Sequence, residues 1–338
     1  MHTKMPTPQH PLASRLFDAS ATAADVVANL DLFGRTAIVT GGHSGIGRET
    51  TRALRNAGAT VVVPVRDPAK GAEAVADIPG VEIDRLDLSD PLSIDAFAER
   101  FLNGGRPLHI LINNAGTQGV PLRLDSRGYE SQFATNHLGH FQLTTRLWPA
   151  LVRAGGARVV SVSAAAHRVS PVVFEDIHYT RRAYDPMAAY GQSKTANILF
   201  ARGLDERGDP FGIRAFSLHP GAIVGTKLSP WATPEMLRSL ELIDEDGNPV
   251  IDPYQGKKTA EQGASTSVWC ATSDELSGLG GVYCLENNVA PVAVPREDDS
   301  RWTTELRLPT GVSPHAVDPG STETLWTVSE KLTGVLLD

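Results

Sequence analysis

A tyrosine and a lysine stand four residues apart in the string Tyr190-Gly-Gln-Ser-Lys194. The surrounding pattern is helical, so both side chains project from one face of a helix. A free tyrosine has a pKa of about 10 and is a poor acid or base at neutral pH. A lysine ammonium one turn away favours the phenolate and lowers that pKa toward the working range. The pair is therefore suited to protonate a carbonyl oxygen that becomes an alkoxide, or to deprotonate an alcohol.

Three glycines, Gly41, Gly45 and Gly47, follow an apolar run at 36–40 and open a helical pattern at 46–57. Glycine allows the unusual backbone angles of such a turn and lets the backbone approach a pyrophosphate closely. The helix N-terminus then supplies free N–H groups and the positive end of the helix dipole. A glycine-rich turn alone is a weak signal, but in this strand–turn–helix context it predicts a site for the phosphates of a dinucleotide.

The residues after the second predicted strand select between nicotinamide cofactors. An acidic side chain there binds the ribose 2′-hydroxyl, whereas an arginine accommodates a 2′-phosphate. Val65 holds the usual acidic place, and Arg66 follows it with a guanidinium that can form two hydrogen bonds to a phosphate. NADP(H) is therefore favoured over NAD(H), unless Arg66 pairs with Asp67 or Asp84 instead. Arg48 is left open as a second basic contact or a helix-surface residue.

Composition excludes several classes of protein. The 338 residues carry a net charge of −8 and no cluster of lysine and arginine, which argues against nucleic acid as a partner. Cys270 and Cys284 are too few for a disulfide framework, and His137 and His140 lack a third ligand, so no metal site is expected. No run of 18 apolar residues is present. The first residues lack the apolar segment of a signal peptide, and a cytoplasmic protein is expected.

The organisation of the chain predicts an α/β domain. From residue 35 onward, apolar runs alternate with helical patterns, as in βαβ units around a parallel sheet. We expect strands at 36–40, 60–65, 81–86, 108–112, 157–163, 213–218 and 281–285, and the longest helices at 131–151 and 186–207. The predicted parts are an N-terminal extension at 1–34, one dinucleotide-binding and catalytic domain at 35–295 with a substrate lid at 230–256, and a C-terminal tail at 296–338.

The motifs together resemble the short-chain dehydrogenase/reductase superfamily, and within it the retinol-dehydrogenase-like group. The resemblance covers about residues 30–292. It rests on Thr40-Gly-Gly-His-Ser-Gly-Ile-Gly47, Arg66-Asp-Pro-Ala-Lys-Gly71, Asp87-Leu88, Asn113-Asn-Ala-Gly116, Asn136-His-Leu-Gly-His-Phe141, Tyr190-Gly-Gln-Ser-Lys194 and His219-Pro-Gly221. It implies a Rossmann-type, doubly wound sheet of seven parallel strands in the order 3-2-1-4-5-6-7. Such proteins commonly form dimers or tetramers, so a homodimer or homotetramer is one expectation.

The resemblance also implies roles for individual residues. Asp87 would contact the adenine amine, Asn114 would line the adenosine, Asn136 would hold a water of the proton relay, and Lys194 would also bind the nicotinamide ribose. The expected cofactor-binding residues are Gly41, His43, Ser44, Gly45, Ile46, Gly47, Arg66, Asp87, Leu88, Asn114, Ala115, Gly116, Tyr190, Lys194, Pro220, Gly221 and Thr226. Thr226 departs from the family pattern, because a threonine or serine usually stands one residue earlier, where this chain has Gly225.

A larger departure lies at the end of the fifth predicted strand. The family places a serine there that polarises the substrate carbonyl, and this chain has Ala164 at that position. Three explanations compete. Ser163 substitutes through a local shift, although a step of one residue along a strand turns a side chain to the other face. Alternatively Tyr190 alone suffices, or the chain no longer performs the usual carbonyl reduction, an engineered serine-to-alanine change included.

The expected catalytic residues are therefore Asn136, Ser163, Tyr190 and Lys194. The favoured function is an NADP(H)-dependent oxidoreductase that interconverts a carbonyl and an alcohol on a small apolar substrate. The alternative is a redox-silent NADP-binding protein of the same fold that acts as a sensor, scaffold or non-redox catalyst. Ala164 motivates the alternative, whereas the intact proton-transfer residues favour the enzyme.

Overall fold

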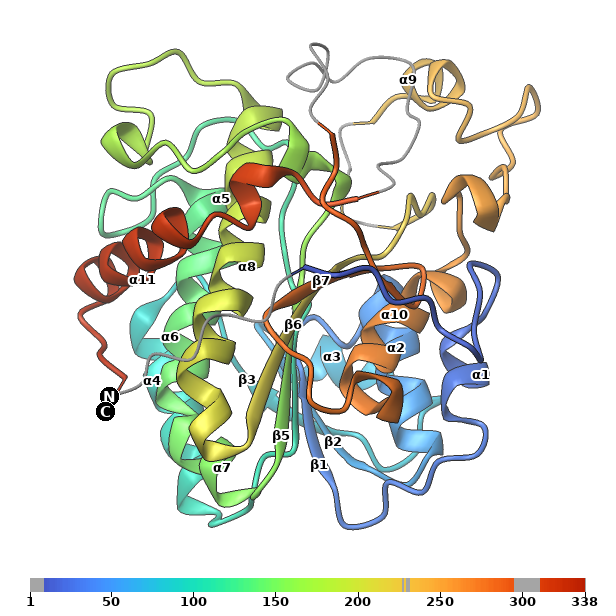
Figure 1. The fold of residues 1–338 in the computed structure, drawn as a ribbon, viewed down its shortest axis with the longest axis vertical. Coiled ribbons are helices and arrows are strands. Elements are labelled where there is room, and N and C mark those ends of the chain that lie inside the picture. The colour runs from blue at the N-terminus through green and yellow to red at the C-terminus, as the bar shows by residue number, and fades with distance from the viewer. Residues whose placement is uncertain (1–8, 227, 229–231, 295–310, 338) are drawn as a thin grey trace.

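The computed structural model describes residues 9–226, 228, 232–294 and 311–337. One sheet runs through the molecule with helices on both faces, in the strand order β3-β2-β1-β4-β5-β6-β7-β8 (Figure 1). Its strands are β1 Thr36–Val39, β2 Thr60–Val65, β3 Glu82–Arg85, β4 Ile110–Asn113, β5 Ala157–Val162, β6 Ile213–His219, β7 Val282–Leu285 and β8 Asn288–Val289. The predicted order of the first seven strands, all parallel, is confirmed.

The central strands are apolar on both faces, as parallel strands covered by helices must be. In β1, Ile38 packs toward one helical layer, and Ala37 and Val39 pack toward the other. One layer holds α1 Ala23–Val27, α2 Gly45–Asn56, α3 Pro68–Ala74 and α10 Ala260–Thr272, and the other holds α4 Pro91–Asn103, α6 Gly139–Arg146, α7 Trp148–Arg153 and α8 Pro186–Gly208. The carboxyl ends of all seven parallel strands therefore meet at one edge.

The eighth strand is a difference from the prediction. β8 has two residues and pairs antiparallel with β7 through Leu285 and Asn288. The turn between them has φ values of 53° at Glu286 and 61° at Asn287. Two central residues with positive φ suit a tight hairpin, and asparagine tolerates that conformation better than most residues. A strand of two residues is too short for a periodicity argument to detect.

The predicted helix at 131–151 is interrupted. It consists of α5 Ser131–Phe133, a π-helical segment η1 Ala134–Leu138, then α6 and α7. Within η1 the N–H of Gly139 donates to the carbonyl of Ala134, five residues back, instead of four. Single π-turns inside α-helices frequently mark functional sites, and Asn136 lies in this one.

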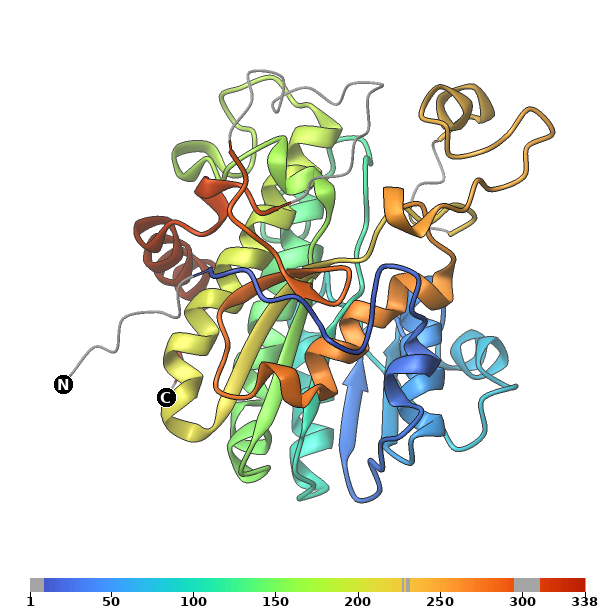
Figure 2. The ribbon, with the colours of Figure 1, turned by 45° about the vertical axis from the view of Figure 1, so that its right-hand side comes forward.

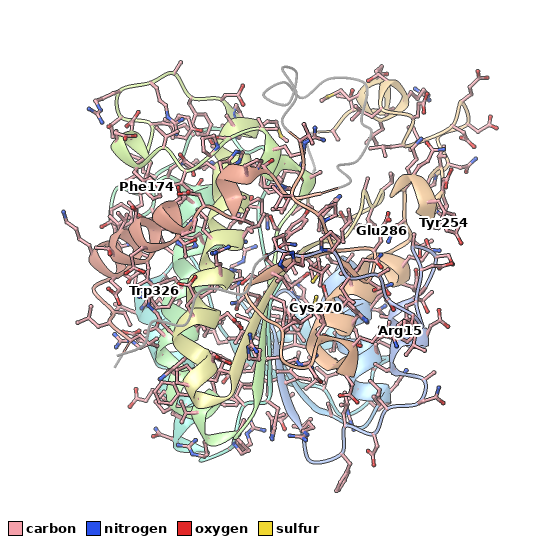
Figure 3. All side chains as sticks on the ribbon, viewed as in Figure 1. Arg15, Phe174, Tyr254, Cys270, Glu286 and Trp326 are labelled. Atoms are coloured by element: carbon pink, nitrogen blue, oxygen red, sulfur yellow. The ribbon has the colours of Figure 1, made fainter. Side chains whose placement is uncertain are left out.

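The C-terminal helix α11, Pro319–Thr333, packs against α8. Trp326 lies on the inner face of α11 (Figure 3), with ring centroids 5.1 Å from Phe141 and 6.0 Å from Phe200. His137 Nε2 lies 2.7 Å from Ser329 Oγ at the same interface. Because that serine hydroxyl donates to the Leu325 carbonyl, the imidazole donates its own N–H to Ser329. The tail helix therefore covers α6 and α8 with both aromatic packing and a buried hydrogen bond.

The segment predicted as a lid folds into a short helix and turns. α9, Pro234–Ser239, stands near the carboxyl edge of the sheet, apart from the helices that cover its faces (Figure 2). Ile243 and Pro249 pair antiparallel, and Lys257 forms an ion pair of 3.3 Å with Glu241. Residues 230–231, where the predicted segment begins, lie outside the described residues, and its role as a lid stays a prediction. None of the helices in the described part of the chain is long and apolar enough to cross a membrane.

Candidate active site

The glycine turn, residues 40–47, joins β1 to the first turn of α2. Gly41 and Gly45 have φ values of 66° and 52°, which favour glycine. A methyl group added to Gly47 would lie against the Gly41 carbonyl oxygen and 2.5 Å from Asn114 Nδ2. Ser44 caps α2 with an extended backbone and makes no side-chain capping bond within the described chain. The first N–H groups of α2 thus face a tight turn whose glycines leave the backbone open to a ligand, as anion binding at a helix N-terminus requires.

Thr40 connects the glycine turn to the end of β4 through hydrogen bonds. Its hydroxyl oxygen accepts hydrogen bonds from the backbone N–H groups of Asn114 and Ala115, at 2.9 and 3.0 Å. The Asn114 side-chain amide donates to the Thr40 carbonyl at 2.8 Å. A methyl group on Gly116 would lie 3.2 Å from Asn136 Oδ1 and 3.5 Å from Lys194 Nζ. Residues 114–116 therefore lie between the glycine turn on one side and Asn136 and Lys194 on the other.

Asn136 has a fixed orientation. Its side-chain amide exchanges two hydrogen bonds with the backbone of Thr117, at 2.8 and 2.9 Å, and donates to Ser193 Oγ at 2.9 Å. The backbone carbonyl of Asn136 accepts a hydrogen bond from His140 Nδ1 at 2.9 Å. Since a carbonyl only accepts, His140 carries its proton on Nδ1, and Nε2 accepts from the Thr40 hydroxyl 2.9 Å away. Burial lowers the pKa of His140 to about 4, which agrees with a neutral ring.

Thr40, Thr117 and His140 were not predicted as site residues. Each forms hydrogen bonds with a residue that was predicted: Thr40 with Asn114, and both Thr117 and His140 with Asn136. His140 follows Asn136 by four residues, a spacing that in a helix brings a side chain back to the carbonyl four positions earlier. That spacing was the available signal. Which of the ring nitrogens meets a carbonyl follows only from the folded geometry.

Tyr190 and Lys194 are both buried on α8 and lie one turn apart. Lys194 Nζ donates to the Val162 carbonyl at 2.9 Å and lies 5.6 Å from the centroid of the Tyr190 ring. The Tyr190 hydroxyl has no hydrogen-bond partner within the described part of the chain. Burial raises the pKa of Tyr190 and lowers the pKa of Lys194 to about 8. The direction of the Tyr190 shift is therefore opposite to the expected one, and burial is its cause.

The lowered pKa of Lys194 predicts a pH dependence of stability in the protein without cofactor. The unfolded chain keeps its lysine proton up to about pH 10.4, whereas the folded chain releases it near pH 8. The unfolded state therefore binds more protons in this window, and stability rises with pH. Lys194 alone should add about 2 kcal/mol between pH 7 and 10. Chemical denaturation at each pH of wild type and Lys194→Met measures this as a difference.

Lys70→Met is the matched control, because the Lys70 side chain is 84% exposed and should leave the pH slope as in wild type. Comparing each variant with wild type removes the contribution of other groups that titrate in the same range. A slope identical in wild type and Lys194→Met would contradict a desolvated Lys194.

Ser163 and Ala164 point to different surroundings at the end of β5. Ser163 is buried and its hydroxyl donates to the Lys194 backbone carbonyl at 2.8 Å, inside the α8 layer. Ala164 is half-buried with an extended backbone and precedes a short helix, η2 Ala165–Arg168. The Ser163 proton is thus committed to a backbone oxygen. This geometry gives no support to the expectation that Ser163 substitutes for the missing family serine.

Arg66 is exposed at the end of β2 and makes no hydrogen bond or ion pair with any described residue. The two carboxylates that were alternative partners for Arg66 form ion pairs with other residues. Asp84 pairs with Arg100 at 2.9 Å, and Asp67 pairs with Lys70 at 3.5 Å. Arg48 instead donates to the Ala74 carbonyl and to Asp77, at 3.0 and 2.6 Å. It is therefore a helix-surface residue, whereas Arg66 has no partner among the described residues.

The remaining expected cofactor contacts lie around the same edge of the sheet. Asp87 caps the turn after β3 by accepting from the Ser89 N–H and hydroxyl, at 2.9 and 2.6 Å, and Leu88 is buried. Gly221 has a φ of 98°. Thr226 comes close to the glycine turn, because a methyl group on Gly45 would lie 3.4 Å from Thr226 Cγ2. The displaced threonine therefore still reaches the N-terminus of α2.

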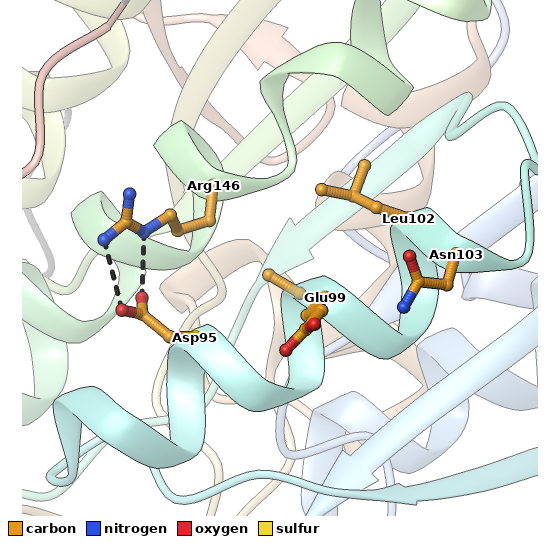
Figure 4. A pocket seen from close by; sticks show the side chains of 6 residues that line it. Asp95, Glu99, Leu102, Asn103 and Arg146 are labelled. Atoms are coloured by element: carbon orange, nitrogen blue, oxygen red, sulfur yellow. Dashed lines mark hydrogen bonds and ion pairs between the residues drawn. The ribbon is translucent and has the colours of Figure 1, made fainter.

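His43, Ser44 and Ile46 lie in the glycine turn, and Pro220 and Gly221 lie directly after β6, at the carboxyl edge of the sheet. No group of three histidine, cysteine, aspartate or glutamate side chains in the described ranges could hold a metal ion. A shallow hollow between α4 and α6 is lined by Asp95, Ala98, Glu99, Leu102, Asn103 and Arg146 (Figure 4). It contains none of the candidate residues, and the Asp95–Arg146 ion pair closes one side of it.

The fold and the arrangement of the site define a dinucleotide-binding α/β protein, and the comparisons give its family. The sequence profile of the short chain dehydrogenase family matches residues 35–235. A "Probable oxidoreductase" of Streptomyces antibioticus is 44% identical over 304 residues, which span 88% of this chain and 97% of that protein. Retinol dehydrogenase 12 of Homo sapiens is 37% identical over 313 residues, 91% of this chain and 89% of that protein.

A solved structure of an uncharacterized protein from Mycobacterium paratuberculosis is 33% identical, with a TM-score of 0.69 over 94% of this chain and 99% of that one. The chain belongs to the short-chain dehydrogenase/reductase family and to its retinol-dehydrogenase-like group. It is an oxidoreductase of that family by sequence and by fold.

Proposed function

We propose that this chain is an NADP(H)-dependent oxidoreductase that interconverts a carbonyl and an alcohol on a small apolar substrate, with Tyr190 as the acid–base. The observation that carries the proposal is the Tyr190 hydroxyl, which has no hydrogen-bond partner among the described residues. It lies beside Lys194, whose Nζ is close to Gly116 after the end of β4. The similarity to retinol dehydrogenase 12, a protein named for an apolar alcohol, supports an apolar substrate. A cytoplasmic location and self-assembly remain part of the proposal.

The residues of the site fit a nicotinamide dinucleotide. The close approach of Gly47 to Gly41 and Asn114 leaves no room for a side chain at position 47, as a backbone site for pyrophosphate requires. Gly41–Gly47, Asn114 and Thr226 would hold the phosphates and adenosine, Asp87 the adenine, and Arg66 a 2′-phosphate. Lys194, Pro220 and Gly221 would hold the nicotinamide end. The cofactor, when bound, supplies or accepts the hydride.

The proton steps belong to this chain's own side chains. Burial raises the pKa of Tyr190, so its hydroxyl keeps its proton at neutral pH and is ready to donate it. The Tyr190 O–H bond breaks and an O–H bond forms on the substrate oxygen as that oxygen becomes an alkoxide. Lys194, charged below about pH 8, stabilises the resulting phenolate. Asn136 would hold a water molecule through which a proton returns from solvent to Tyr190. This arrangement suits carbonyl reduction.

A specific observation favours a second candidate, the redox-silent NADP-binding protein. Ala164 offers no hydroxyl at the usual serine position, and the Ser163 hydroxyl is turned to Lys194. The experiment that separates the two candidates is NADPH oxidation with a panel of apolar ketones and aldehydes, alongside NADPH binding. Turnover of any panel member supports the oxidoreductase, and tight binding without turnover supports the silent protein. Failure to bind NADPH would contradict both.

Arg66→Ala tests the choice of cofactor. The Kd for NADPH should rise about 10- to 100-fold, the cost of losing a hydrogen bond to a charged phosphate, while the Kd for NADH should not change. Arg153→Ala is the matched control, because Arg153 is exposed on α7 before β5, at the opposite end of the sheet. Fluorescence titration of both cofactors measures the effect. An equal loss for NADH and NADPH would contradict a 2′-phosphate contact.

A further inference from the structure

His167 is fully buried in η2, three residues after Ala164, and both of its ring nitrogens are occupied. Nδ1 lies 2.7 Å from the Ala164 carbonyl, so this nitrogen carries the proton. Nε2 then accepts the backbone N–H of Ser313 at 3.1 Å. Burial lowers the pKa of His167 to about 3, which agrees with a neutral ring. One imidazole thus links a residue near the C-terminus to the backbone of the residue at the family's serine position.

The His167 backbone carbonyl forms a second link between the same segments. It accepts from His315 Nε2 at 2.9 Å and lies 3.0 Å from the hydroxyl of Thr195. Thr195 follows Lys194 on α8 and also donates to the Ser170 carbonyl, 2.7 Å away. Backbone and side chain of His167 therefore fasten η2 to α8 and to the C-terminal segment, residues 311–316.

The C-terminal segment has its own anchors on the chain that follows β8. Val312 pairs in parallel with Val292, through hydrogen bonds of 2.9 and 2.7 Å to Pro291 and Ala293. Val312 and Ala316 are fully buried in a small apolar cluster with Ile198, Tyr283 and Ala290. In Figure 1 this segment leads into α11 across the upper part of α8. These contacts hold the C-terminal segment in a fixed place, where Ser313 and His315 form hydrogen bonds with His167 of η2.

We propose that His167 and the C-terminal segment are positioning elements of the active site. They fix the turn that begins at Ala164 relative to Tyr190 and Lys194, so that a substrate carbonyl is presented to the Tyr190 hydroxyl at the correct distance. The inference rests on the proposed function for its catalytic consequence. Within the described chain, neither His167 nor residues 311–316 form a hydrogen bond with the glycine turn, so we expect an effect on turnover and not on cofactor affinity.

Ser313 offers a matched pair of variants. Its backbone φ of −65° is one that proline adopts, so Ser313→Pro needs no new backbone angle at this position. The proline removes the N–H donor and places a ring carbon toward His167 Nε2, which lifts the segment from η2. Ser313→Ala keeps the N–H, and the Ser313 side chain makes no capping hydrogen bond in the described chain. Any difference between the two variants therefore reports the link to His167.

Two readouts test the proposal. In hydrogen exchange, the amides of Ala164–Val169 should exchange at least about tenfold faster in Ser313→Pro than in Ser313→Ala, while those of Gly45–Asn56 keep their rates. In steady-state kinetics, kcat should fall about 10- to 100-fold in Ser313→Pro, the scale of a small misplacement of reacting groups. The KM and Kd for NADPH should not change. A merely structural role would lower the folded fraction without this split between kcat and KM.

Unchanged exchange at Ala164–Val169 in Ser313→Pro would overturn the proposal, as would faster exchange without a lower kcat. A wild type that binds NADPH and turns over no substrate would count against the proposed function alone. In that case the exchange comparison still decides whether the segment holds the turn.

Discussion

Tyr190→Phe should lower kcat about 10²- to 10⁴-fold, the contribution of a positioned general acid–base. The change removes one hydroxyl and keeps the ring that fills the buried space beside Lys194. Because that hydroxyl has no partner within the described residues, its removal breaks no internal hydrogen bond, and the free energy of unfolding should change little. NADPH affinity rests mainly on the glycine turn and should stay close to that of wild type. Single-turnover kinetics with NADPH and a substrate from the panel measure the loss.

Tyr179→Phe is the control for Tyr190→Phe. Tyr179 is also buried, its hydroxyl also lacks a partner in the described chain, and it lies before α8 and outside the motif that carries Tyr190. Its replacement should leave kcat unchanged. If Tyr190→Phe retained wild-type turnover, another group would have to supply the proton, and the proposed mechanism would fail even with the fold and cofactor binding intact.

The sheet was predictable because its signals are local and repeated. Each parallel strand is a short apolar run, and the glycine turn and Tyr190-Gly-Gln-Ser-Lys194 are strings in a fixed order along the chain. The βαβ topology then brings their ends to one edge. The order of seven strands and the family followed from these strings. β8 and the π-turn η1 did not, because each depends on one or two hydrogen bonds that periodicity does not encode.

The electrostatics of the site were not predictable from spacing. The four-residue step from Tyr190 to Lys194 predicts a phenolate stabilised by a nearby ammonium, and this part of the geometry is present. The direction of the Tyr190 pKa shift is nevertheless opposite, because both groups lie in a buried place where desolvation acts on each. The degree of burial depends on how α8 packs between the sheet and α11. No local pattern in the sequence contains that information.

The links made by His167 show the same limit at longer range. Ser313 lies 146 residues from His167 along the chain, and neither residue belongs to a recognised motif with the other. His167 is not among the predicted catalytic or cofactor-binding residues. The folded chain shows instead that its imidazole and its carbonyl each face a specific partner, which leaves neither ring nitrogen for a substrate. A hydrogen bond between residues so far apart in the sequence can be identified only from the folded structure.

Ala164→Ser should raise kcat by up to about 10²- to 10³-fold, the effect of one hydrogen-bond donor to a developing oxyanion. Ala164 is half-buried in an extended backbone at the end of β5, so a hydroxyl there can be accommodated and does not share the commitment of Ser163 to Lys194. The KM for NADPH should not change, because the residue lies apart from the glycine turn. Turnover of the substrate panel by both proteins measures the gain.

Ser163→Ala completes this test, because it separates the explanations for the missing serine. If Ser163 only holds α8 to β5, its loss should cost about 1 kcal/mol of unfolding free energy and leave kcat unchanged. A gain in Ala164→Ser together with a neutral Ser163→Ala would mean that wild type works through Tyr190 without a second donor. A large loss of kcat in Ser163→Ala, with no gain from Ala164→Ser, would instead return the donor role to Ser163. Turnover that exists only in Ala164→Ser would identify the chain as a cofactor-binding protein whose redox chemistry depends on one absent hydroxyl.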